Sequence, residues 1–119
     1  MGWFDALRRP RAEDPRAALV APIEQALRAL GWVDGEVGPP RAVTSAFGSD
    51  DGMPFEQWLA QVFLPRLHEA RAAGQWPPRS DVAVAAWRNL DGQPGVESLL
   101  RLLAQLDERI NKGIHPARG

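Results

Sequence analysis

Residues 54–70 read PFEQWLAQVFLPRLHEA, and this apolar run with an internal proline decides the fold. At about 100° per residue, the apolar side chains of its first half share one helix face: Phe55, Trp58, Leu59 and Val62. Those of its second half are displaced around the axis: Phe63, Leu64, Leu67 and Ala70. Pro65 lies at this change and removes one helical hydrogen bond, so we predict a central helix over residues 54–73 that kinks at the proline.

A first helix is predicted upstream of this run. Asp14 and Pro15 form a helix-start signal, and Gly31 ends a pattern of apolar residues at three-to-four spacing: Leu19, Val20, Ile23, Leu27 and Leu30. Pro22 interrupts the pattern, so the helix either kinks there or begins later. Residues 31–52 then form a long, turn-rich connection, which we expect four apolar residues to hold against the bundle: Trp32, Val33, Val43 and Phe47.

Two helices are predicted downstream. Ser80 or Asp81 is expected to cap a short helix over residues 82–90, whose inner face would consist of Val84, Trp87 and Leu90. The last helix, over residues 96–112 with Gly113 closing it, carries the broadest apolar stripe: Val96, Leu99, Leu100, Leu103, Leu106 and Ile110.

These patterns predict an all-α chain, a compact four-helix bundle-like domain with a proline-kinked central helix and a long first loop. The domain occupies residues 14–113. Residues 1–13 form an N-terminal extension that we expect to be flexible, and residues 114–119 form a short tail.

The composition fits one domain with a single core. The chain has 119 residues, of which 45% are hydrophobic, and its formal net charge of −1 gives no global attraction to nucleic acid or anionic lipid. It contains no cysteine, which excludes disulfides and cysteine nucleophiles and suits a reducing compartment. Because no stretch approaches the roughly 20 apolar residues of a membrane span, we expect a cytoplasmic protein that does not engage a membrane.

A diagnostic pattern combines Trp58-Leu59, the string FLPRLH at residues 63–68 and the leucine-rich last helix. Over residues 47–113 this pattern resembles the YqcC-like family of small bacterial proteins. The resemblance implies a four-helix bundle-like fold, a cytoplasmic location and no established activity. Some members of that family carry a tRNA pseudouridine synthase label. Such synthases have a mixed, sheet-rich catalytic domain with an aspartate nucleophile, so for this helical chain the label implies a partner and not an activity.

The candidate binding site surrounds the predicted kink and comprises Trp58, Pro65, Arg66 and His68. A bent helix can leave backbone carbonyls unpaired and direct side chains into a groove. No catalytic residue is assigned, because the sequence shows no phosphate-binding glycine loop, nucleophile elbow or triad. No metal or cofactor is expected either, since the only histidines are His68 and His115 and no ligand spacing accompanies them.

A purely structural reading of the same residues stays open. In that reading Arg66 forms an ion pair with Glu69 or with a partly buried Asp107, and His68 faces solvent. A buried acid without a partner would be costly, which is why Asp107 is expected to be paired.

The N-terminal extension offers a second candidate surface. One side of a short turn would carry Trp3, Phe4 and Leu7, and a basic cluster follows: Arg8, Arg9 and Arg11. This segment could dock on a partner, an RNA backbone or a membrane surface, or be disordered, or fold back onto its own domain.

Three functions follow from these observations. The favoured one is a non-enzymatic protein–protein interaction or adaptor module, which binds another protein or forms a homodimer. The second is an accessory factor of tRNA modification that contacts a tRNA pseudouridine synthase, with nucleic acid bound only indirectly or through the basic cluster. The third is an unrecognised hydrolase or metal enzyme.

Overall fold

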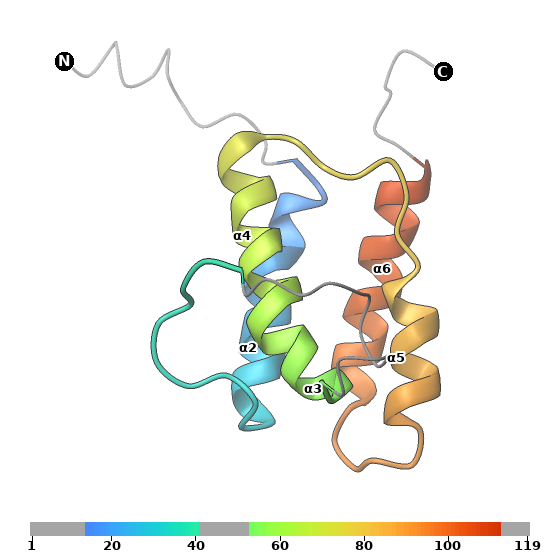
Figure 1. Ribbon diagram of the computed structural model, residues 1–119. Helices are drawn as coiled ribbons and strands as arrows, with labels where there is room; N and C mark the ends of the chain where they lie inside the picture. Colours follow the sequence, from blue (N-terminus) through green and yellow to red (C-terminus); the bar gives the residue numbers. More distant parts are fainter. Residues whose placement is uncertain (1–13, 41–52, 113–119) are drawn as a thin grey trace, which may run out of the picture.

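The computed structural model describes residues 14–40 and 53–112, and within these ranges the chain forms helices and connections but no strand (Figure 1). The predicted all-α, four-helix bundle-like architecture is therefore confirmed. The extension at 1–13, the tail at 114–119, Val43, Phe47 and Gly113 all lie outside the described residues. The division of the chain at residues 13 and 113 stays a prediction.

The first helix begins later than Asp14. A 3-10 turn, η1 (Ala17–Leu19), leads into α2 (Val20–Ala29). Pro22 lies in the first turn of α2, where its missing N–H costs no helical hydrogen bond, so the second of the two predicted alternatives is correct. Gly31 has φ +81° and ends the helix as predicted, because this left-handed conformation lets the Trp32 N–H bond to the Leu27 carbonyl at 3.0 Å.

The central helix runs from Phe55 to Ala73 in three parts: α3 (Phe55–Trp58), a π-helical turn η2 (Leu59–Phe63) and α4 (Leu64–Ala73). In the π turn the Leu64 N–H bonds to the carbonyl of Leu59, five residues back. Pro65 follows directly and is buried. The structure departs from a regular α-helix just before the proline, in one widened turn, while the predicted bend of the axis at Pro65 stays a prediction. Gly74, with φ +70°, ends the helix.

The last two helices are α5 (Val82–Leu90) and α6 (Glu97–Lys112). The apolar stripe predicted for α6 is buried from Leu99 to Ile110. The inner face predicted for α5 is wrong at two positions, because Val84 is 53% exposed and Trp87 is 58% exposed. Small residues fill that place instead and let α5 approach α6 closely. The buried face of α5 consists of Val82, Ala83, Ala86 and Leu90.

The helices pack around one core. Helix α6 contacts both α5 and α2, and α2 also contacts α4, while the connection over residues 74–81 crosses from α4 to α5 (Figure 1). Trp32 and Val33 pack against the core as predicted and hold the start of the first connection. The core residues without solvent exposure include Ile23, Leu27, Leu59, Leu64, Leu90 and Leu103.

Candidate functional site

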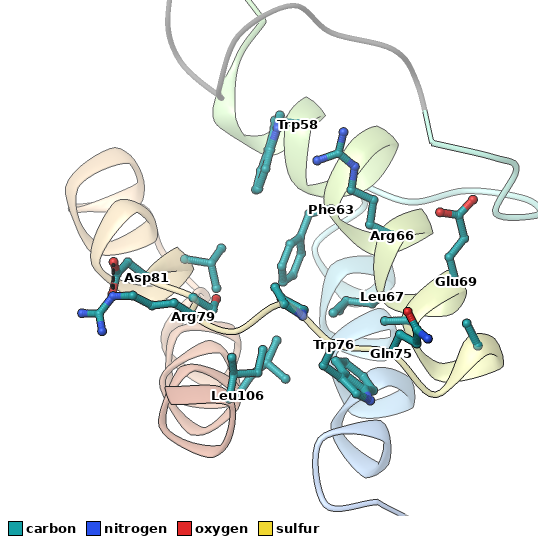
Figure 2. A pocket seen from close by; sticks show the side chains of 16 residues that line it. Trp58, Phe63, Arg66, Leu67, Glu69, Gln75, Trp76, Arg79, Asp81 and Leu106 are labelled. Carbon is teal, nitrogen blue, oxygen red and sulfur yellow. Dashed lines mark ion pairs between the residues drawn. The ribbon is translucent and has the colours of Figure 1, made fainter. Parts of the chain in front are cut away.

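A groove with a volume of about 640 Å³ lies between the central helix, the 74–81 connection and α6. We call it the docking groove. Its lining is mainly apolar, and Figure 2 shows rings from two different elements along it. The apolar side chains that form the lining are Trp58, Phe63, Leu67, Trp76, Val82, Leu106 and Ile110.

The π turn creates the aromatic wall of this groove. Phe63 follows Trp58 by five residues, and in a regular α-helix two such side chains point about 140° apart. The widened turn reduces this angle. The two rings stack, with centroids 5.5 Å apart and planes inclined by 24°. Phe55 also stacks with Trp58, with centroids 5.7 Å apart, but Phe55 is buried in the core. The π turn therefore places the rings of Trp58 and Phe63 together in the lining of the groove.

The wall opposite the aromatic rings, which we call the far wall, consists of residues 80–82 and the facing side of α6. A buried acid on α6, Asp107, holds it in place. The carboxylate of Asp107 accepts hydrogen bonds from the backbone N–H groups of Val82 at 3.2 Å and Ala83 at 2.7 Å, and from the Ser80 hydroxyl at 2.5 Å. Asn111, one turn further along α6, pairs with both backbone groups of Ser80 at 2.8 Å. Residues 80–83 are thereby fixed against α6.

This arrangement corrects two predictions. Asp107 is 8% exposed, as its position suggested, but its partners are the first amides of α5 and not Arg66. Neither Ser80 nor Asp81 caps α5 through its own side chain. A carboxylate from another helix supplies the acceptor that a local N-cap residue would provide.

Charged residues surround the mouth of the groove: Arg66, Glu69, Arg79 and Asp81. Arg79 and Asp81 approach each other to 3.7 Å (Figure 2). Within the described parts of the chain Arg66 is exposed and forms no ion pair, so the predicted pairing with Glu69 or Asp107 is wrong. The rim thus offers both signs of charge to a ligand.

The four predicted site residues do not converge. Trp58 and Arg66 line the docking groove, whereas Pro65 is buried and lines a separate hollow of about 330 Å³ beside Trp32 and the first connection. His68 lies toward α2 and contacts Glu24. No contact among the described residues gives Pro65 or His68 a place in the groove.

His68 belongs to a polar cluster that joins α4 to α2. Its Nε2 lies 2.7 Å from Glu24 Oε1, and Arg28 donates to the other oxygen of the same carboxylate at 2.8 Å. Arg28 also donates to the Gly35 carbonyl at 2.8 Å. Burial raises the pKa of Glu24, but the hydrogen bonds from Arg28 and His68 outweigh it and hold that pKa below its ordinary value. The His68 side chain is 40% exposed, so it does reach solvent as expected, but it also has a partner in Glu24 that was not expected.

Sequence reasoning missed the contributions of Trp76 and Asp107 to the groove. Trp76 stands between two helices in the sequence QWPP, where an isolated large aromatic residue is a usable signal. For Asp107 the signal is a polar pair, Asp107 and Asn111, at i and i+4 beside the apolar stripe of α6.

In the parts of the chain that the structure describes, no helix has the length and apolar content of a membrane-spanning helix. Across ranges 14–40 and 53–112, no three side chains of the metal-binding types gather at one place.

The model of the DUF446 family, described as "tRNA pseudouridine synthase C", matches residues 16–109 of the chain. No curated protein and no solved structure matches it. The matched range contains the central helix, the 74–81 connection and most of α6, and therefore nearly the whole lining of the docking groove.

Proposed function

The chain belongs to the DUF446 family, a small uncharacterised family, and we propose that it acts as a non-enzymatic protein–protein interaction or adaptor module in the cytoplasm. The docking groove carries this proposal. Its aromatic and aliphatic lining resembles the anchor pockets of protein interfaces, where partly buried tryptophans dominate binding. An apolar area of this kind on the surface of a monomer is typical of an interaction site.

The chemistry of the groove favours an amphipathic peptide segment as its ligand. Apolar side chains of such a segment would enter between Phe63 and Leu106, and its charged residues would meet the rim at Arg66 or Asp81. The buried polar groups of the far wall already have partners, because Asp107 is saturated by amides and a hydroxyl. A ligand therefore gains its affinity from apolar burial and from rim charges.

The test is affinity capture of the full chain from its own cells with paired variants. Arg66→Glu reverses a charge at the rim of the groove. Arg101→Glu makes the same change at an exposed position of α6 outside the groove, and so serves as the matched comparison. We expect a protein that is retained by the wild type and by Arg101→Glu to be lost with Arg66→Glu. Equal retention by all three would place the interaction elsewhere.

A second candidate function is supported by the description of the family model. In this proposal the chain is an accessory factor of tRNA modification, in line with a YqcC-like identity, and its partner is a tRNA pseudouridine synthase. The experiment is a pull-down of the purified synthase with the full chain, with and without tRNA. Absence of retention in both conditions removes this candidate, and pseudouridine formation by the chain alone would contradict a non-enzymatic role.

A homodimer is a further form of the adaptor proposal. Sedimentation of the full chain at several concentrations measures it directly. A mass that doubles with concentration for the wild type but not for Arg66→Glu would make a second copy the partner of the groove.

A further inference from the structure

The chain upstream of Asp14 starts beside one end of the docking groove. Arg16 lies over the ring of Trp76, with its Cζ 5.5 Å from the ring centroid, and it is paired with Asp14 at 2.8 Å. The hydrogen bond from the Arg16 side chain holds the pKa of Asp14 below its ordinary value. Arg109 of α6 donates to the carbonyl of Pro15 at 2.6 Å. These contacts fix the point from which residues 1–13 continue.

Residues 1–13 read MGWFDALRRPRAE. Their apolar and charged side chains are of the types that could bind the apolar lining and the charged rim of the groove. Trp3, Phe4 and Leu7 have the spacing that would place them on one side of a helical turn. Asp5 and Arg8 beside them offer a negative and a positive charge. The rim of the groove presents both signs as well, at Arg66, Glu69, Arg79 and Asp81.

The length of the segment is sufficient. Trp3 precedes Asp14 by eleven positions, and an extended chain of that length reaches about 36 Å. The required affinity is also low, because a short tether gives an effective concentration of order 1 mM. A segment that binds the groove with a dissociation constant near 1 mM as a free peptide would occupy it about half of the time when tethered.

We propose that residues 1–13 bind in the docking groove of their own chain, with Trp3, Phe4 and Leu7 against its apolar lining. The segment then competes with the partner protein for one surface. This inference rests on the proposed function of the groove as a peptide-binding site, and it adds the ligand that occupies the site when the partner is absent.

The experiment uses the full chain and the indole N–H signals of its tryptophans in heteronuclear NMR spectra. The variant combines Trp3→Ala, Phe4→Ala and Leu7→Ala. We expect the signals of Trp58 and Trp76 to shift relative to the wild type, because both line the groove. The signal of Trp87, which is exposed on α5 outside the groove, should stay in place and report that the fold is intact.

Addition of a synthetic peptide of residues 1–13 to the triple variant supplies the second measurement. We expect the peptide to return the Trp58 and Trp76 signals toward their wild-type positions at millimolar concentration, and a peptide with the same three alanines to have no effect. Unmoved Trp58 and Trp76 signals in the triple variant would overturn the proposal. A wild-type dimer that becomes a monomer in the triple variant would also overturn it, because the segment would then bind a second copy.

Failure of this inference is separable from failure of the proposed function. If the triple variant leaves the Trp58 and Trp76 signals unchanged while Arg66→Glu still loses a captured partner, only the inference fails. If the signals shift as expected but capture is insensitive to Arg66→Glu, the segment binds the groove and the partner binds elsewhere.

Discussion

Helix α6 is closely packed on the side that faces α5 and leaves an open groove on the side that faces α4. Toward α5, small side chains allow close contact, and Asp107 and Asn111 satisfy the backbone groups at the start of that helix. Toward α4, an apolar groove stays open and charged residues surround its mouth. In the described residues no buried side-chain polar atom lacks a partner, so the open side is not a defect of polar pairing. The closed side supports stability, and the open side is the surface that we propose for binding.

The largest effect is expected from the core that both sides share. Leu103 has no solvent exposure, and Leu103→Ala leaves a cavity that the surrounding helices fill only in part. We expect a loss of about 2–5 kcal/mol in the free energy of unfolding, measured by urea denaturation. A value within about 0.5 kcal/mol of the wild type would contradict the burial of this residue.

A smaller but still large effect is expected on the closed side. Asp107→Ala leaves the amides of Val82 and Ala83 and the Ser80 hydroxyl without their acceptor, and we expect a cost of about 1–3 kcal/mol in urea denaturation. Asp107→Asn keeps one acceptor oxygen and should cost less. Because Asn is nearly isosteric with Asp, equal losses for the two variants would mean that both carboxylate oxygens are needed, and a full loss confined to Asp107→Ala would mean that volume and not hydrogen bonding explains the effect.

On the open side, Pro65→Ala tests whether the proline maintains the π turn. The variant regains a backbone N–H, which allows a regular α-helix in which Trp58 and Phe63 separate around the axis. We expect a change of about 1 kcal/mol or less in stability but a clear loss of the near-UV circular dichroism of the stacked rings. An unchanged near-UV spectrum would show that the turn persists without the proline.

A weak, pH-dependent effect is expected at the cluster of Glu24, Arg28 and His68. The pKa of Glu24 is lowered in the folded state, so its contribution is complete above the ordinary value of 4.5 and is lost as the pH falls through the lowered value. After allowance for partial exposure we expect about 0.5 kcal/mol, measured as the difference in stability between the wild type and Glu24→Gln at pH 7.

This difference should shrink as the pH falls below 4.5. Glu108→Gln is the matched comparison, since Glu108 pairs with Lys112 at 3.0 Å on an exposed face. A Glu24→Gln effect that grows as the pH falls would reverse the sign of the linkage.

The smallest effect on stability is expected from Arg66→Ala. Arg66 is exposed and forms no ion pair in the described part of the chain. We therefore expect the free energy of unfolding to change by no more than about 0.5 kcal/mol, and the melting temperature to change little. A strong decrease in the melting temperature would instead indicate a structural role. Loss of partner binding with unchanged stability would sharpen the distinction between the two sides of α6.

The fold was predictable because its signals are local. The apolar stripes of α2, the central helix and α6, together with Gly31 and Gly74, define helix faces and ends within a few residues of sequence. Helix α5 marks the limit of this reasoning. The apolar periodicity of α5 fits two helix faces equally well, one that buries Trp87 and one that buries Ala83 and Ala86. In the structure the alanine face is buried, because small side chains permit closer packing of α5 against α6.

The site was predictable only in part, because its residues come from separate elements. Trp58 and Arg66 lie on one helix and could be associated by their spacing around the proline. The opposite wall depends on contacts such as that between Asp107 and Ala83, which are 24 residues apart in the sequence. The apolar periodicity also does not indicate a π turn. The stacking of Phe63 on Trp58 depends on that turn, so it could not be predicted from the sequence.

The acceptor that Asp107 supplies to α5 has a consequence for the order in which the protein acquires its structure. A helix of nine residues is marginal in water by itself, and the group that completes its first turn lies on a segment synthesised later. We therefore expect residues 82–90 to become a stable helix only after residue 107 has been synthesised. Amide hydrogen exchange should then report a common opening for the two C-terminal helices.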